Sequence, residues 1–286
     1  MQLLTFNYTV IDYRAMIKKL GLIGGGVMGE AILSRLITRE IYAAGEIIVS
    51  EPQTTRQNFL TQKYGVTTCE DNQQVLSEST EIILLAVKPQ VFGAISQDLS
   101  ETGNLKNHPV IISIMAGVAL KQLELAFPHQ PIIRAMPNTP ATIGAGITAM
   151  CAGSYANPQH IQLAKVLLQA VGDVVEVSEH LMDAVTGLSG SGPAYVALLI
   201  EALADGGVAA GLPRAIANQL ALQTVLGTAE LLKESKLHPA ELKDRVTSPG
   251  GTTIAGIAQL EKAGFRSALI EAVKAATARS QELGKG

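Results

Sequence analysis

The feature that most constrains the fold of this chain is a glycine-rich turn between a short apolar segment and a helical pattern. Residues 20–23 predict a buried strand, and apolar residues then recur with helical spacing from Ile32 to Ile37. Between them, glycines follow the spacing G-x-G-x-x-G, which gives a tight turn, room for a pyrophosphate against the backbone, and close helix–strand packing. The turn therefore predicts a dinucleotide site, with the alternative that the glycines only pack the helix on the sheet. The predicted cofactor contacts in this turn are Gly24, Gly26, Val27, Met28 and Gly29.

A second predicted strand, residues 46–50, is followed at once by an acidic residue, Glu51. In nucleotide-binding folds, a carboxylate at this place favours the free ribose hydroxyls of NADH and repels the extra phosphate of NADPH, whereas an arginine does the reverse. Arg56 lies a short distance further along the chain. Glu51 is therefore a predicted cofactor contact, and the preference between NADPH and NADH stays open.

Strands and helices alternate through the first half of the chain. Further strands are predicted at 66–68, 82–87, 110–115, 131–136 and 147–150. Near-continuous apolar strands between amphipathic helices are typical of a parallel sheet covered on both faces, which predicts a doubly wound, Rossmann-like α/β domain over residues 16–177. The ligand crevice of such a sheet lies at the carboxyl ends of its strands. Residues that follow the strands are thus candidate cofactor contacts: Ala86, Val87, Lys88, Pro89, Ala116 and Asn138.

Composition excludes several classes of function. Hydrophobic residues make up 47% of the 286 and charged residues 16%, so the chain can bury a large core. The formal net charge is −3 and no arginine-rich stripe is present, which argues against a nucleic-acid partner. Cys69 and Cys151 are too few for a disulfide framework or a zinc cluster. They predict buried free thiols in a reducing, cytoplasmic setting, with no metal required.

Neither of two candidate segments has the pattern of a membrane span or of an export signal. Residues 184–200 lack charge, but they contain several glycines, a proline and hydroxyl side chains, so we expect no membrane span there. Residues 1–15 lack the positive charge and continuous apolar run of a secretory signal. They form a predicted N-terminal extension ahead of Met16, a candidate initiator.

Residues 178–286 predict an all-helical second domain. Ser191 and Pro193 suit the N-cap and first turn of a helix at 194–209, and a second helix extends to about Lys233. The second helix has apolar residues on nearly every face, and a helix of this kind is buried all round. The domain has few elements to enclose it, so we expect a second subunit to do so, the alternative being a well-covered monomeric bundle.

A loop near the C-terminus, residues 248–253, has the composition of an anion site. Glycines let the backbone approach a ligand, and the helix that follows starts with amide groups that lack intrahelical partners. Ser248 or Thr252 could cap this helix, and the Thr253 hydroxyl lies beside the same pocket. The alternative is an ordinary capped junction.

Together these segments resemble the pyrroline-5-carboxylate reductase family over residues 19–283. The resemblance is carried by Ala86–Pro89, Asn138–Pro140, residues 183–195, Ala204–Gly207, and Leu242–Asp244 leading into Ser248–Thr253. It implies reduction of the cyclic imine pyrroline-5-carboxylate to proline, with NADPH usually the better donor. It also implies a helical dimerisation domain, active sites shared between subunits, and dimers that commonly assemble into rings.

The resemblance assigns roles to individual residues. Ser248, Gly250, Gly251 and Thr252 would hold the substrate carboxylate, while the Thr253 hydroxyl meets the ring nitrogen. Glu179 would lie near the substrate, paired with the imine nitrogen directly or through water, or else be an ordinary solvated glutamate. Asn72, after the third strand, would touch the adenosine half of the cofactor.

Two other functions are alternatives to the reductase. A hydroxyacid dehydrogenase of the 6-phosphogluconate or 3-hydroxyisobutyrate type shares a similar first motif and a helical second half. Those enzymes place a catalytic lysine in the glycine-rich stretch that opens the helical domain, and residues 187–193 contain none. A non-catalytic nucleotide-sensing module would explain the glycine turn but would leave the loop 248–253 without a purpose.

Overall fold

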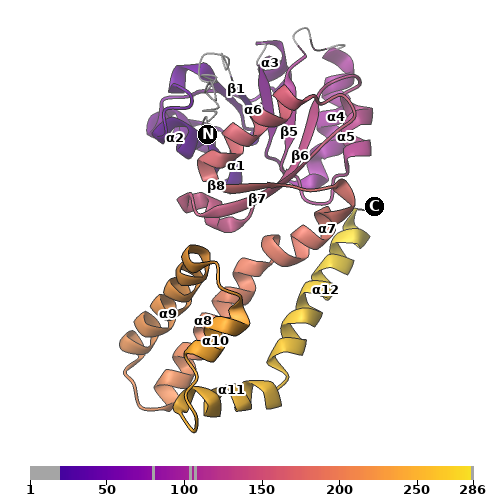
Figure 1. Cartoon of the computed structure of the whole chain (residues 1–286). Helices are drawn as coiled ribbons and strands as arrows, with labels where there is room; N and C mark the ends of the chain where they lie inside the picture. The colour runs from indigo at the N-terminus through magenta and orange to yellow at the C-terminus, as the bar shows by residue number, and fades with distance from the viewer. Residues whose placement is uncertain (1–19, 79–80, 103–104, 106–107, 285–286) are drawn as a thin grey trace, which may run out of the picture. The chain divides into compact units, whose positions relative to one another are not determined.

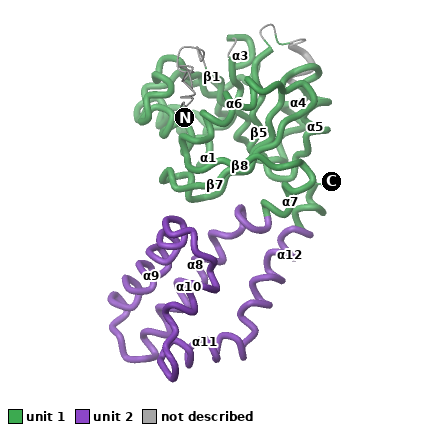
Figure 2. Tube along the Cα trace, in the orientation of Figure 1, with its two compact units in different colours: residues 1–186, 279–286 green, residues 187–278 purple. Residues whose placement is uncertain are grey.

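The computed structural model describes residues 20–78, 81–102, 105 and 108–284. The predicted extension at residues 1–15 lies outside these. Contacts between Cα atoms divide the chain into two compact units: residues 1–186 with 279–286, and residues 187–278 (Figure 2). We call them the sheet unit and the helical unit.

The sheet unit is built on one eight-stranded sheet (Figure 1). Its strand order is β3-β2-β1-β4-β5-β6-β7-β8, and every neighbouring pair is parallel except β6 and β7. This confirms the predicted Rossmann-like sheet. The strands are β1 (Leu20–Ile23), β2 (Ile47–Ser50), β3 (Thr67–Cys69), β4 (Ile82–Leu85), β5 (Val110–Ser113), β6 (Ile132–Met136), β7 (Gly146–Ala152) and β8 (Gly172–Glu176).

The far edge of the sheet differs from the prediction in two ways. Strand β7 is antiparallel to β6 because only a short 3-10 segment, Thr139–Ile143, joins them, and a parallel crossover needs about a dozen residues or more. Strand β8 was not predicted. Gly172, Asp173 and Glu176 interrupt its apolar pattern, which an edge strand with one neighbour tolerates.

Apolar side chains of the central strands pack on both faces of the sheet. Leu20 and Leu22 of β1 belong to one buried cluster, and Ile23 belongs to a second. Strand β4 alternates in the same way, with Ile82 in the first cluster and Ile83 in the second. Such strands are covered by helices on both faces. These helices are α1 (Val27–Thr38), α2 (Thr54–Tyr64), α3 (Asn72–Ser77), α4 (Phe92–Thr102), α5 (Leu120–Ala126) and α6 (Pro158–Leu168).

The division between the units falls at 186/187, whereas the sequence suggested 177/178. The short helix α7 (Met182–Val185) belongs to the sheet unit, because Met182 is 1% exposed and packs in the second cluster. The last turn of α12 (Phe265–Leu283) also belongs to it, since the Ser280 hydroxyl donates a 2.7 Å hydrogen bond to the Asp183 carboxylate. The chain therefore returns to the sheet unit at its C-terminus.

The helical unit contains the predicted helices. Helix α8 (Gly192–Ala209) has Pro193 in its first turn, as predicted. Ser191, however, does not cap it with a side-chain hydrogen bond. Its backbone is helical (φ −83°, ψ −22°) because a π-helical turn, Thr186–Gly190, leads into α8. The others are α9 (Arg214–Ser235), α10 (Pro239–Arg245), α11 (Thr252–Lys262) and the part of α12 up to residue 278.

The core of the helical unit is small. Its buried cluster consists of Ala204, Ala217 and Ala221, with Ile200 and Val208 packed against it. Large apolar side chains of α8 and α9 are exposed in the single chain, among them Leu198, Leu220, Leu222 and Leu226. By length and composition alone, the helical segment 179–209 could cross a bilayer, with a mean hydropathy of 1.2 over 18 of its residues. The expectation that residues 184–200 do not span a membrane stays a prediction. The same exposed surface is expected of a helix that packs against a second subunit.

Candidate active site

The glycine turn between β1 and α1 has the geometry of a dinucleotide cradle. Gly24 has a φ of +101°, and its amide donates to the Ser50 carbonyl at 2.9 Å. A β-carbon on Gly29 would collide with the Gly24 carbonyl oxygen, whereas one on Gly26 would meet no heavy atom within 4 Å. Gly29 thus lets α1 pack closely on β1, and the space at Gly26, beside the free amides of the α1 N-terminus, fits a pyrophosphate.

Two more residues of the turn were predicted to contact the cofactor. Val27, the first residue of α1, is 75% exposed, and Met28 is half-buried and packs against the first buried cluster. Val27 therefore presents an apolar surface at the mouth of the turn. Met28 packs against the core as well as lying in the glycine turn.

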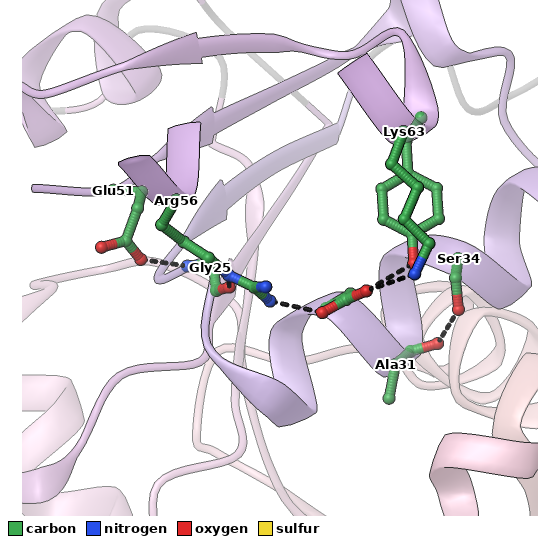
Figure 3. Close-up of polar contacts among 8 residues, drawn as sticks. Gly25, Ala31, Ser34, Glu51, Arg56 and Lys63 are labelled. Atoms are coloured by element: carbon green, nitrogen blue, oxygen red, sulfur yellow. Dashed lines mark hydrogen bonds and ion pairs between the residues drawn. The ribbon is translucent and has the colours of Figure 1, made fainter. Parts of the chain in front are cut away.

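Glu51 lies against the glycine turn (Figure 3). One carboxylate oxygen accepts from the Gly25 amide at 3.1 Å, and the other accepts from the Gln53 amide, also at 3.1 Å. The residue is only 8% exposed. Glu51 therefore stabilises the turn itself, in addition to placing a negative charge beside it.

Arg56 connects the same turn to α1. Its Nε donates to the Gly25 carbonyl at 2.7 Å (Figure 3). Its Nη2 lies 2.5 Å from an oxygen of Glu30. The other oxygen of Glu30 accepts from Lys63 Nζ at 3.0 Å and from the Tyr64 hydroxyl at 2.6 Å. Burial alone would raise the pKa of Glu30, but the hydrogen bonds from Tyr64, Arg56 and Lys63 outweigh it and hold the pKa at about 2.

The other cofactor candidates follow the strands as predicted. The Asn72 side-chain oxygen accepts from the Ser50 hydroxyl at 2.6 Å, and the Asn138 side-chain oxygen accepts from the Ile147 amide at 3.0 Å. Both asparagines thus hold loops at strand ends. The remaining candidates lie after β4 and β5: Ala86, Val87 and Pro89 are half-buried, and Lys88 and Ala116 are exposed.

Glu179 belongs to the sheet unit, where it meets a buried arginine. Its Oε1 accepts from the Leu120 amide at 2.5 Å and lies 3.3 Å from Arg134 Nη1, on a side chain that is 8% exposed. Arg134 also lines a hollow of about 480 Å³. The hollow is bordered by Gly117, Ala119, Arg134, Asp183, Gln281 and Gly284. Glu179 is therefore an ion-paired residue rather than a freely solvated one.

The predicted substrate loop lies in the helical unit. Neither Ser248 nor Thr252 caps α11, because Gly251 is the N-cap and no side chain caps the helix. Gly250 has a φ of +68°, and the Gly251 amide donates to the Ser248 carbonyl at 3.0 Å, so the backbone forms the turn. A β-carbon on Gly251 would collide with the Ser248 hydroxyl. A larger residue at this position would therefore require the Ser248 side chain to move, apart from any ligand.

Comparison with known proteins decides the family. The chain is 62% identical over 267 residues to a pyrroline-5-carboxylate reductase of Synechocystis, and the match covers 93% of this chain and 98% of that protein. The chain belongs to the pyrroline-5-carboxylate reductase family. A family model for pyrroline-5-carboxylate reductase dimerisation matches residues 179–283, and one for F420-dependent NADP oxidoreductases matches residues 19–117.

Solved structures of pyrroline-5-carboxylate reductases agree over the full length. The enzyme from Coxiella burnetii matches with a TM-score of 0.87 and 35% identity, covering 94% of this chain and 99% of that one. The enzyme from Plasmodium falciparum, solved with NADP bound, matches with a TM-score of 0.83 and 31% identity, covering 93% and 98%. The predicted family and fold class are thereby confirmed, and the hydroxyacid dehydrogenase and sensing-module readings are not favoured.

The pyrroline-5-carboxylate reductase resemblance did not reveal the charged contacts around the site. Glu30, Lys63 and Tyr64 were not predicted, and Arg134 was noted only as part of a strand. A signal did exist for Arg134, since a cation inside an otherwise apolar strand needs a partner. For Glu30 the first turn of α1 gave no comparable signal, because an acid there is ordinary.

Proposed function

We propose that this chain reduces 1-pyrroline-5-carboxylate to L-proline by hydride transfer from a nicotinamide cofactor, the final step of proline biosynthesis. The observation that carries the proposal is the 62% identity over 93% of the chain, which includes residues of both halves. NADP(H) is the proposed cofactor, and NAD(H) is the proposed second one. The Gly24–Gly29 turn, open at Gly26, supports dinucleotide use.

The proposed chemistry depends on positioning. The protonated imine of the substrate already accepts hydride well, and the reduced nicotinamide supplies that hydride when bound. Ser248, Gly250, Gly251 and Thr252 surround the carboxylate and offer it backbone amides and a hydroxyl, with the Gly251 amide shared with the Ser248 carbonyl. The Thr253 hydroxyl oxygen accepts from the N–H of the protonated ring nitrogen. Orientation of two reactants can supply roughly 7–11 kcal/mol of a barrier, so no strong acid or metal is invoked.

Glu179 is proposed to act near the substrate, directly or through water. Its carboxylate is held by Arg134 and by the Leu120 amide, and it has further acceptor positions for a protonated imine or a bridging water. Glu179→Gln should therefore lower turnover while leaving cofactor affinity unchanged. Glu176→Gln, which alters another carboxylate of the same segment, is the matched control. Equal turnover in the two variants would reduce Glu179 to a structural role.

The proposal includes an oligomeric state and a cellular compartment for this chain. The family model for dimerisation on residues 179–283 and the exposed leucines of α8 and α9 support a homodimer. We propose a ring of dimers as the larger assembly. We propose no nucleic-acid partner and no membrane insertion. The apolar segment 179–209 then contacts the second subunit, and the two free, buried cysteines suit the cytoplasm.

A coupled assay tests the reaction. Purified protein should oxidise NADPH or NADH when given pyrroline-5-carboxylate, with and without a metal chelator. Absence of turnover with both cofactors, on protein shown to be folded and dimeric, would refute the reaction. Activity lost on chelation and restored by a metal would refute the metal-free mechanism alone.

A further inference from the structure

Glu30 has no part in the proposed reaction, yet it is the most heavily engaged acidic residue near the glycine turn. It lies in the first turn of α1 and receives hydrogen bonds from Arg56, Lys63 and Tyr64 of helix α2. Its side chain is 20% exposed and that of Arg56 is 25% exposed. A partly buried carboxylate with three donors is a fixed charge rather than a mobile surface group.

Arg56 is held in place by the same contacts. Its Nη2 pairs with Glu30, its Nε donates to the Gly25 carbonyl at 2.7 Å, and its guanidinium lies 4.9 Å from the centre of the Phe59 ring. The guanidinium therefore lies beside the glycine turn, next to the residue whose amide Glu51 accepts. The positive charge of Arg56 is paired with the Glu30 carboxylate, and the Glu51 carboxylate lies nearby at the same turn.

We infer that Glu30 is a positioning residue for cofactor selection: it neutralises and holds Arg56, so that the charge of Glu51 dominates the adenosine end of the site. This inference rests on the proposed use of a nicotinamide dinucleotide. The four charged side chains Glu30, Glu51, Arg56 and Lys63 sum to zero formal charge. Without Glu30 they would sum to +1, and two cations would lose their nearest anion.

The consequence differs between the two cofactors. A phosphate monoester carries about −1.5 to −2 charges at pH 7, so the extra phosphate of NADPH responds to a released Arg56 far more than the ribose hydroxyls of NADH do. Arginine binds phosphate with two parallel hydrogen bonds when its donors are free. Glu30 therefore limits the affinity for NADPH through Arg56, without itself reading the nucleotide.

The test compares the affinities of wild-type and variant protein for NADP⁺ and NAD⁺, measured by isothermal titration calorimetry in the absence of substrate. Glu30→Gln should improve the affinity for NADP⁺ relative to NAD⁺ by about fivefold to tenfold at low salt, where tenfold equals about 1.4 kcal/mol. The effect should shrink as salt is raised. Adenosine 2′,5′-bisphosphate should show the same gain and 5′-AMP none, which assigns the change to the extra phosphate.

Two further variants serve as controls. Glu46→Gln removes one negative charge at the other end of β2, where Glu46 accepts from the Ala43 amide, and should change the ratio by less than twofold. Glu30→Gln combined with Arg56→Gln should return the ratio to the wild-type value or below it. Melting temperatures of all variants show which of them remain folded.

Each outcome bears on the inference. A ratio unchanged by Glu30→Gln, an equal loss of affinity for both nucleotides, or a gain that persists in the double variant would overturn it. A ratio that moves toward NAD⁺ would also overturn it, since Glu30 would then be presenting Arg56 to the phosphate. Wild-type protein that binds neither nucleotide would refute the proposed function instead. Failure of the proposed function is thus distinguishable from failure of the inference about Glu30.

Discussion

The two units of this chain reach stability in different ways. In the sheet unit, strands such as β4 are fully buried, and each face of the sheet has its own apolar cluster. In the helical unit, the buried cluster consists of three alanines, while leucines on α8 and α9 are about half exposed. The sheet unit can therefore complete its core within one chain. The helical unit leaves its apolar surface exposed in the single chain, and we propose that a second subunit covers it, since a dimerisation family model matches residues 179–283.

The strongest test of this contrast is a charge placed on the helical unit. Leu220, on α9, is 53% exposed in the single chain, and Leu125, on α5 of the sheet unit, is 73% exposed. Leu220→Asp should abolish the dimer at micromolar concentration and with it the activity, because a buried unpaired carboxylate is costly. Leu125→Asp, the matched control, should change neither. Light scattering and the coupled assay give the readouts, and a dimeric, active Leu220→Asp protein would place the interface elsewhere.

A core truncation tests the other side of the contrast. Leu84 of β4 is 0% exposed, so Leu84→Ala should lower the free energy of unfolding by about 2–5 kcal/mol. This loss should not depend on protein concentration. Leu198→Ala, at a side chain 65% exposed on α8, should instead give a loss relative to wild type that grows on dilution. Urea titrations of wild type and both variants at two protein concentrations separate the two behaviours, and a Leu84→Ala loss relative to wild type that changes with concentration would contradict the argument.

Glu51 tests whether cofactor choice belongs to the sheet unit alone. Glu51→Ser removes a carboxylate that accepts from two backbone amides at the glycine turn. The ratio of catalytic efficiencies should shift toward NADPH by about tenfold, near 1.4 kcal/mol. The Michaelis constant for the imine should stay constant. An unchanged cofactor ratio would mean that Glu51 acts only on the conformation of the turn.

Thr253 is the corresponding probe in the helical unit. Thr253→Ala should lower turnover, because it removes one hydrogen bond to the ring nitrogen of the substrate. The activation free energy should rise by about 0.5–1.5 kcal/mol, and by more for a charged ring nitrogen. Cofactor affinity, followed by fluorescence titration, should not change. Gly251→Val is a weaker probe, since its side chain would collide with Ser248 and disturb the loop itself. Loss of cofactor affinity in Thr253→Ala would move this loop to the nucleotide site.

The smallest expected effect is a pH dependence in the sheet unit. Hydrogen bonds hold the pKa of Glu30 at about 2, below its usual value of 4.5. A depressed carboxyl pKa stabilises the fold above pH 4.5, and this stabilisation is lost as the pH falls toward 2. Between pH 5 and pH 3, wild-type protein should lose up to about 1 kcal/mol that Glu30→Gln does not lose, the pair being partly exposed. Parallel acid titration curves for the two proteins would contradict this.

The sequence by itself determined the elements whose signals are local. The glycine spacing at Gly24–Gly29 and the apolar runs of β1, β2 and β4 predicted the nucleotide turn and the sheet, since each signal depends on neighbouring residues. The helices around Pro193 and Gly211 followed from the same kind of signal. Apolar residues on nearly every face of α9 also predicted a second subunit, because a helix with this pattern has to be buried on all sides.

Only the tertiary structure decided which side chains meet. Three pairs, Glu51 with Gly25, Arg56 with Glu30, and Glu179 with Arg134, lie 26, 26 and 45 residues apart in the sequence and are in contact in the folded chain. The reversal of β7 and the edge strand β8 likewise depend on chain connections and pairing partners. Hydrogen bonds and ion pairs are short-ranged and directional, so their partners become definite only when packing has fixed the elements that carry them.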